Sequence, residues 1–159
     1  RSYLSLFLKE SGVSFGAEDE NAFPMRLLHF RRTFVEKMFA IHGKIEILKR
    51  EGRELGGYAR HYYDLFQLSQ RPEVLAMLQS TEYTEIKTDY DRVSREHFPN
   101  SYYFPEGMRF SNSDALFPTG ALAVMIADAY TKQCELLCFG AYPSWEEVAA
   151  CFKEFRQHL

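Results

Sequence analysis

Residues 33–52 read TFVEKMFAIHGKIEILKREG, and this stretch decides the fold. Thr33 and Glu36 have the spacing of a capping box, in which each side chain accepts a hydrogen bond from the other residue's backbone amide. The apolar residues after Thr33 recur every three or four positions, which is the period of an α-helix: Phe34, Met38, Ile41, Ile45 and Leu48. Gly52 is a typical stop. We therefore expect a long amphipathic helix ending near Glu51.

The chain after this helix also predicts helices. Gly56-Gly57 precedes a second helix, Pro72 suits the first turn of a third, and Ser144 with Glu147 forms another capping box. We expect helices at about residues 58–69, 72–78, 82–96, 118–138 and 145–157, and an ordered aromatic loop over residues 99–113.

The chain before residue 32 predicts less. Residues 2–11 indicate a short helix. The apolar run within Ala22–Phe30 favours one short strand, which Pro24 restricts to an edge. The expected fold class is therefore mainly α, a helical bundle with one short N-terminal strand. We expect residues 1–31 to be a helix-strand linking segment and residues 32–159 to be the α-helical domain.

The composition allows a substantial core and excludes some classes. Hydrophobic residues make up 46% of the 159 residues, yet no window approaches the uninterrupted apolar run of a membrane span. Cys134 and Cys138 lie four apart on an expected helix, without the turn and further ligands of a zinc knuckle. With Cys151 they indicate reduced thiols. We expect a cytoplasmic protein without a membrane partner.

Basic residues gather in one part of the chain. From Arg31 to Arg71 there are nine Lys and Arg against five Asp and Glu, whereas the remainder has ten against seventeen. A basic segment on an acidic body indicates either an anionic ligand near that segment or a solvated helix face.

Two short motifs in this basic segment could carry chemistry. Lys37 in Arg32-Thr33-Phe34-Val35-Glu36-Lys37 borders the apolar stripe, where a lysine either binds phosphate or extends to solvent. In Arg60-His61-Tyr62-Tyr63-Asp64-Leu65, the residues Arg60, His61 and Asp64 share a helix face. That arrangement suits either a supported carboxylate base or an ordinary surface ion pair.

Simple hairpin geometry does not bring the two motifs together. A turn near residue 54 would place Asp64 opposite Lys44, which leaves Lys37 roughly 10 Å away along the helix. A crossing angle or a further element would have to close this gap.

The two motifs in this order resemble the third and fourth motifs of the AbiEii/AbiGii nucleotidyltransferase toxins. The expected strand before Arg32 and several later segments resemble the family as well. These segments are Pro105-Glu106-Gly107-Met108-Arg109-Phe110, Ala127-Asp128-Ala129-Tyr130 and residues 139–155.

The resemblance implies part of a Pol β-like nucleotidyltransferase with Mg²⁺ and a nucleoside triphosphate (NTP) in the full-length protein. It implies that Lys37 contacts nucleotide phosphates and that Asp64 is a second catalytic residue. Arg32, Arg60 and His61 are expected to bind the nucleotide. Known members transfer nucleotides, some of them onto tRNA, and are paired with a cognate antitoxin.

The resemblance also implies an N-terminal domain, absent from this chain, that holds the metal ions. The one Asp-x-Asp pair here, Asp89 and Asp91, lies in an expected helix, where the two carboxylates diverge. We expect no metal ligands and no nucleotidyl transfer from residues 1–159 alone. The alternative is a non-enzymatic helical module that docks RNA or a protein partner through its basic hairpin.

Overall fold

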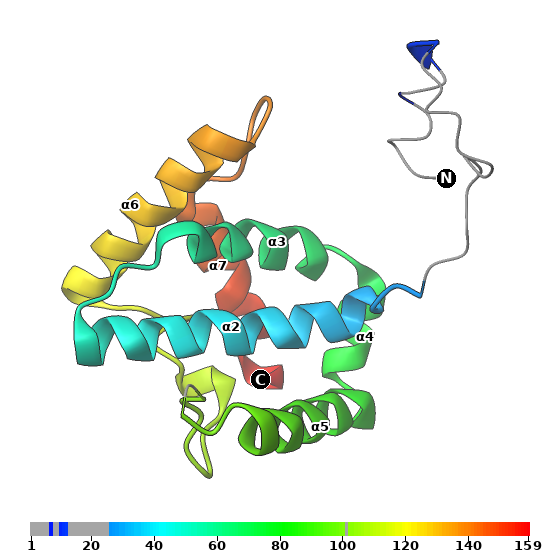
Figure 1. Ribbon diagram of the computed structural model, residues 1–159, viewed down its shortest axis with the longest axis vertical. Coiled ribbons are helices and arrows are strands. Elements are labelled where there is room, and N and C mark those ends of the chain that lie inside the picture. Colours follow the sequence, from blue (N-terminus) through cyan, green and yellow to red (C-terminus); the bar gives the residue numbers. More distant parts are fainter. Residues whose placement is uncertain (1–6, 8–9, 13–25, 101) are drawn as a thin grey trace.

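The computed structural model describes residue 7 and residues 10–12, 26–100 and 102–159. Its described part forms a bundle of six α-helices joined by short 3₁₀ turns and loops (Figure 1). In chain order the α-helices are α2 (Phe30–Glu51), α3 (Arg60–Ser69), α4 (Pro72–Leu78), α5 (Thr81–His97), α6 (Gly120–Leu137) and α7 (Trp145–Phe155). The 3₁₀ turns are η1 (Gly56–Ala59), η2 (Phe110–Asn112) and η3 (Arg156–His158).

The mainly helical fold class is confirmed, but the short strand is corrected. Residues 26–29 have no regular structure, and Phe30 already belongs to α2. The side chain of His29 accepts a hydrogen bond from the amide of Arg31 and so begins the helix at residue 30. The rest of the expected strand, residues 22–25, and most of the helix expected over residues 2–11 lie outside the described residues.

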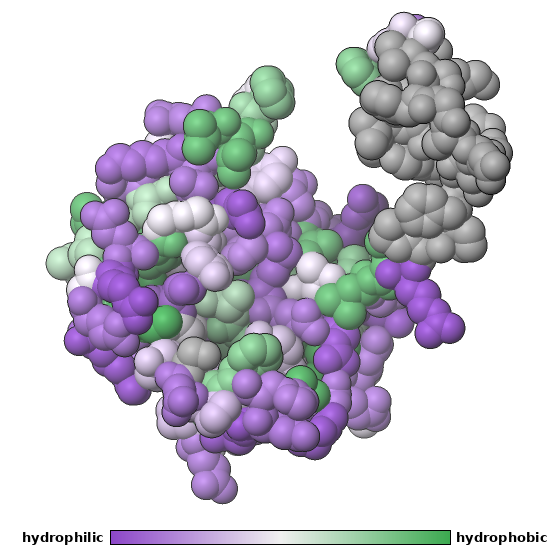
Figure 2. All heavy atoms as spheres, in the orientation of Figure 1, coloured by the Kyte–Doolittle hydropathy of each residue, from purple (hydrophilic) through white to green (hydrophobic). Residues whose placement is uncertain are grey.

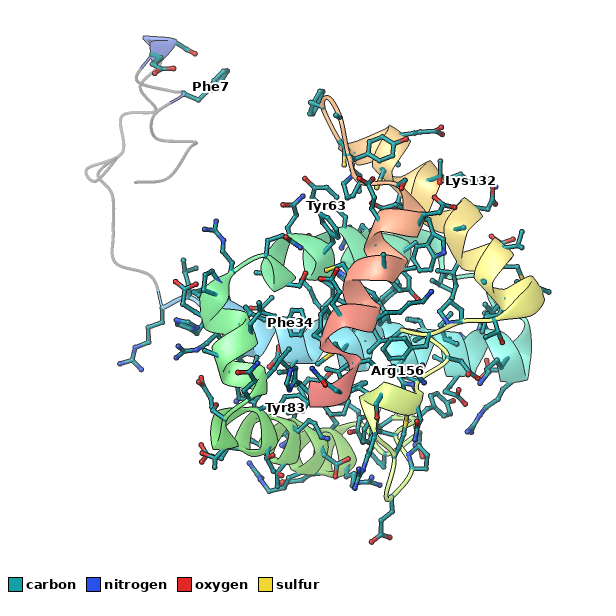
Figure 3. The ribbon with its side chains drawn as sticks, turned by 180° about the vertical axis from the view of Figure 1, so that it is seen from behind. Phe7, Phe34, Tyr63, Tyr83, Lys132 and Arg156 are labelled. Atoms are coloured by element: carbon teal, nitrogen blue, oxygen red, sulfur yellow. The ribbon has the colours of Figure 1, made fainter. Side chains whose placement is uncertain are left out.

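Helix α2 is the central element of the bundle. Figure 1 shows it running through the middle, with α3 along one side and α5 along the other. Four residues of its predicted apolar stripe are buried and the fifth, Leu48, is partly buried, while Val35 and Phe39 add further buried side chains. Phe34 contacts Phe155 of α7 edge to face, beneath α7 as seen from behind in Figure 3. A helix covered on several sides leaves only narrow strips for polar side chains.

Helix α3 packs between α2, α6 and α7. Tyr62 is fully buried, and its hydroxyl donates a hydrogen bond to the backbone oxygen of Ala115. Its ring meets the Trp145 ring edge on. These contacts fix the rotation of α3, and they turn the opposite side of this helix toward solvent along the edge of α2.

The aromatic loop after α5 is ordered by packing rather than left free. Phe104 and Phe110 are buried against Phe39, and the hydroxyl of Tyr102 donates to Asp91. This confirms the expected ordered loop. No helix in the described part of the chain is both long and apolar enough to span a bilayer.

Candidate functional site

The side chains of Lys37, His61 and Asp64 meet on one face of the bundle. Lys37 precedes His61 by 24 residues and Asp64 by 27 residues in the sequence. The connection between α2 and α3 explains how the gap expected from a simple hairpin is closed. Residues 52–59, including η1, run back over α2, so that α3 begins part-way along it (Figure 1). Asp64 therefore lies opposite Lys37 instead of Lys44.

The three side chains touch one another at hydrogen-bonding distance. The ammonium Nζ of Lys37 lies 2.7 Å from Oδ2 of Asp64 and 3.0 Å from Nδ1 of His61. Nδ1 of His61 lies 3.2 Å from the same Oδ2. We name these three residues the Lys-His-Asp cluster.

The cluster cannot satisfy all of its contacts at once. Nδ1 of His61 either accepts a hydrogen bond from Lys37 or donates one to Asp64, because a ring nitrogen of neutral imidazole carries either a proton or a lone pair. Among the described residues, the other carboxylate oxygen of Asp64 has no hydrogen-bond partner. The cluster thus keeps unused donor and acceptor capacity.

The surroundings of Asp64 favour its charged form. Partial burial raises the pKa of Asp64, but hydrogen bonds from His61 and Lys37 together with the Lys37 charge outweigh burial, and the net pKa lies below the usual carboxyl value. The side chain of Asp64 remains 37% exposed and that of Lys37 22%. A charged pair in this half-exposed position is accessible to a ligand.

Arg60 and Arg32 differ in their relation to this cluster. Arg60 is exposed and, among the described residues, forms no ion pair, so the expected i, i+4 contact with Asp64 is not made. Arg32 lies on the α5 side of α2 and contacts the carboxylates of Glu36 and Asp89, each at 2.8 Å. The structure therefore brings His61 to the pair and leaves Arg32 bracing α2 against α5.

Two residues next to the cluster were not singled out from the motifs. The Tyr58 ring contacts the His61 ring edge on, with 5.7 Å between centroids. Nζ of Lys44 lies 4.2 Å from the centroid of the Tyr58 ring. Lys44 is two helical turns after Lys37, a spacing that places both on one side of α2 and could have indicated a continuous basic edge.

The described residues do not fit a magnesium site. No group of three His, Cys, Asp or Glu side chains is placed there to hold a metal ion. Asp89 and Asp91 lie on helix α5, as expected, and are engaged by different arginines, Asp89 by Arg32 and Arg92 and Asp91 by Arg95. Asp64 is the only carboxylate in the Lys-His-Asp cluster, and its partners there are a lysine and a histidine.

The class of protein is thus an α-helical bundle that carries a lysine–carboxylate ion pair on its surface, beside the exposed basic residue Arg60. The family model for the AbiEii nucleotidyl transferase toxins of type IV toxin–antitoxin systems matches residues 8–130. The chain therefore belongs to this family, as the two motifs predicted. Both motifs lie inside the matched segment, whereas residues 139–155 lie outside it. No curated protein and no solved structure matches the chain.

Proposed function

We propose that this chain provides the phosphate-binding side of the active site of a nucleotidyltransferase toxin. The observation that carries the proposal is the 2.7 Å contact between Lys37 and Asp64, which come from separate motifs on separate helices. Membership of the nucleotidyl transferase toxin family supports the reaction class.

Lys37 is proposed to bind a phosphate of the NTP. An ammonium group has three N–H donors, and among the described residues that of Lys37 has two neighbours, Oδ2 of Asp64 and Nδ1 of His61. At least one N–H therefore remains for a phosphate oxygen, and the neighbouring carboxylate fixes the position of the charge. Arg60 is exposed on the first turn of α3 and is proposed to contact the same phosphates, with His61 beside it.

Asp64 is proposed to receive the proton of the attacking hydroxyl through its unused oxygen. In that step the hydroxyl oxygen forms a bond to the α-phosphorus of the NTP, the bond from that phosphorus to the pyrophosphate oxygen breaks, and the proton passes to the carboxylate. Asp64 is ionised at neutral pH because its pKa is held low, so that it can accept a hydrogen bond from the hydroxyl.

Other components of the proposal follow from the family. Mg²⁺ would be held by residues other than those described here, because their carboxylates do not assemble a site. A type IV toxin–antitoxin family implies a cognate antitoxin. tRNA is the acceptor that we propose, and the cytoplasm, where NTPs and tRNA meet, is the proposed location.

The test measures nucleotide transfer to RNA by the native gene product that carries this chain. Lys37→Ala and Asp64→Ala should each lower transfer by at least about 100-fold, with the urea unfolding curve retained. Lys153→Ala is the matched control, since it removes an exposed lysine of α7 far from both motifs in sequence. Unimpaired transfer in both variants would refute the proposal.

The alternative, a docking module without catalysis, gives the opposite result for one variant. The exposed Arg60 and the half-exposed Lys44 on the basic hairpin are the observation that favours it. Loss of the Asp64 carboxylate would then leave toxicity unchanged or tighten an anionic partner, because a repelling charge is removed.

A further inference from the structure

A groove begins about one helical turn beyond Lys37 along α2, and Lys44, which lies on the same side of α2 as Lys37, lines it. It has a volume of about 290 Å³ and lies between α2, η1 and the aromatic loop. We call it the α2 groove. Its lining residues are mainly aromatic or small, with one lysine: Phe39, Ala40, His42, Gly43, Lys44, Ile47, Tyr58, Tyr90, Tyr102, Tyr103 and Phe104.

We infer that the α2 groove binds bases of a single-stranded nucleic acid, which under the proposed function is the acceptor strand. The role of this strand as the acceptor rests on the proposed function. Binding of the strand does not, because it follows from the aromatic lining, the charge and the position of the groove.

Two tyrosines that line the α2 groove are paired with cations. Tyr58 is 42% exposed with Lys44 over its ring, and the guanidinium of Arg50 lies 4.8 Å from the centroid of the Tyr103 ring. Tyr103 is only partly exposed. Accessible aromatic rings beside basic groups are the arrangement with which proteins stack bases and follow a phosphate backbone. Lys44 and Arg50 are six residues apart on α2, or about 9 Å along its axis. Two such platforms suit consecutive bases of a strand better than one mononucleotide.

The charge of the α2 groove also favours an anionic ligand. The α2 groove contains no Asp or Glu, whereas each of four other hollows on the described surface includes at least one. Beyond the groove, Lys37 lies beside the carboxylate of Asp64, and the exposed Arg60 adds positive charge at the first turn of α3. The groove therefore matches a polyanion, and the other hollows do not.

The α2 groove is lined by a glycine, Gly43, that has no structural need to be there. Gly43 lies in the middle of α2, where a glycine destabilises a helix by about 1 kcal/mol relative to alanine. A Cβ atom added at Gly43 would meet no atom within 4 Å, so no packed neighbour requires the glycine. Its effect is to leave the groove open to a flat ligand.

The test measures binding of a fluorescein-labelled single-stranded RNA of about eight nucleotides by anisotropy. Gly43→Phe places a bulky side chain in the groove, and it should not weaken α2 because phenylalanine favours a helix more than glycine does. Gly43→Ala is its matched control. We expect Gly43→Phe and Tyr58→Leu each to raise Kd about tenfold, with Gly43→Ala within about twofold of the original chain. Thermal unfolding of each variant verifies the fold.

Two further binding measurements, with NTPs and with double-stranded RNA, distinguish a single-strand site from a nucleotide site or a duplex site. Binding of NTPs should be weakened by Lys37→Ala and not by Gly43→Phe, and double-stranded RNA should bind less tightly than the single strand. Equal RNA affinity in Gly43→Phe and Gly43→Ala would overturn the inference. So would an NTP affinity that falls with the RNA affinity in Gly43→Phe, because the groove would then hold the nucleotide. Failure of the proposed function would appear in a different measurement, as unimpaired nucleotide transfer in both Lys37→Ala and Asp64→Ala.

Discussion

Two of the polar contacts that helix α2 makes with distant parts of the chain are built in opposite ways. At one, Lys37 meets His61 and Asp64, with charged groups, partial exposure and competing hydrogen bonds. At the other, only five residues further on, His42 is 4% exposed and contacts Ser113 and the backbone of Tyr103.

The contact at His42 is a closed network. Nε2 donates to the carbonyl oxygen of Tyr103, so in neutral imidazole Nδ1 accepts from the Ser113 hydroxyl, whose oxygen in turn accepts from the amide of Ala115. Every ring nitrogen has one role and one partner. The Lys-His-Asp cluster lacks this closure. A buried histidine with both ring nitrogens hydrogen-bonded thus fastens a loop, whereas a partly exposed group with unused hydrogen-bonding capacity can still bind a ligand.

The largest stability effect should come from breaking the closed network. His42→Ala leaves a buried hydroxyl and a carbonyl oxygen without their partner and opens a cavity, which should destabilise the fold by about 2–4 kcal/mol. Urea unfolding followed by circular dichroism measures it. A loss below about 1 kcal/mol would mean that the loop over residues 99–113 is held by aromatic packing alone.

The two contacts should affect the free energy of unfolding in different pH ranges. Burial lowers the pKa of His42 below its usual 6.5, so the unfolded chain binds a proton more readily there and stability should fall as the pH drops below 6.5. The pKa of Asp64 is lowered from its usual 3.8, so the stability that its carboxylate contributes is lost only as the pH falls below 3.8. Unfolding free energies from about pH 7.5 to about pH 5 should decline for the original chain and less steeply for His42→Gln. Equal slopes would contradict this assignment.

The smallest stability effect should come from the open cluster. Lys37→Met and Asp64→Asn should each change the free energy of unfolding by less than about 1 kcal/mol, because a half-exposed ion pair is screened by water. The same variants should lose nucleotide transfer. A loss of more than about 2 kcal/mol would mean that the pair serves mainly to hold α2 and α3 together.

The two expected capping boxes show why helix positions were easier to predict than their first residues. Ser144 and Glu147 form the box at α7, with both reciprocal hydrogen bonds. At α2 the helix begins at Phe30, so the amide and hydroxyl of Thr33 both point to the carbonyl oxygen of His29. Glu36 pairs with Arg32 instead. The apolar period predicted the body of each helix, but the side chain of His29 decided where α2 starts.

The sequence motifs predicted which residues form the candidate site better than they predicted how those residues are arranged. The motifs selected Lys37 and Asp64, and the structure brings these two together with His61. The partners of Arg32 on α5 could not be foreseen, because helical spacing within α2 says nothing of which neighbour covers that side. The approach of Tyr58 and Lys44 likewise depends on the path of η1, which no local pattern encodes.

That path makes the spacing between the motifs as important as the motifs themselves. The segment 52–59 sets where α3 begins against α2, and one residue more or less in it would rotate Asp64 by about 100° and shift it by about 1.5 Å unless the segment rebuilt its turn. A chain could then keep every residue of both motifs and still hold the lysine and the carboxylate apart. Among related sequences, the length of this connection is therefore a criterion for an assembled site, alongside the residues at either end of it.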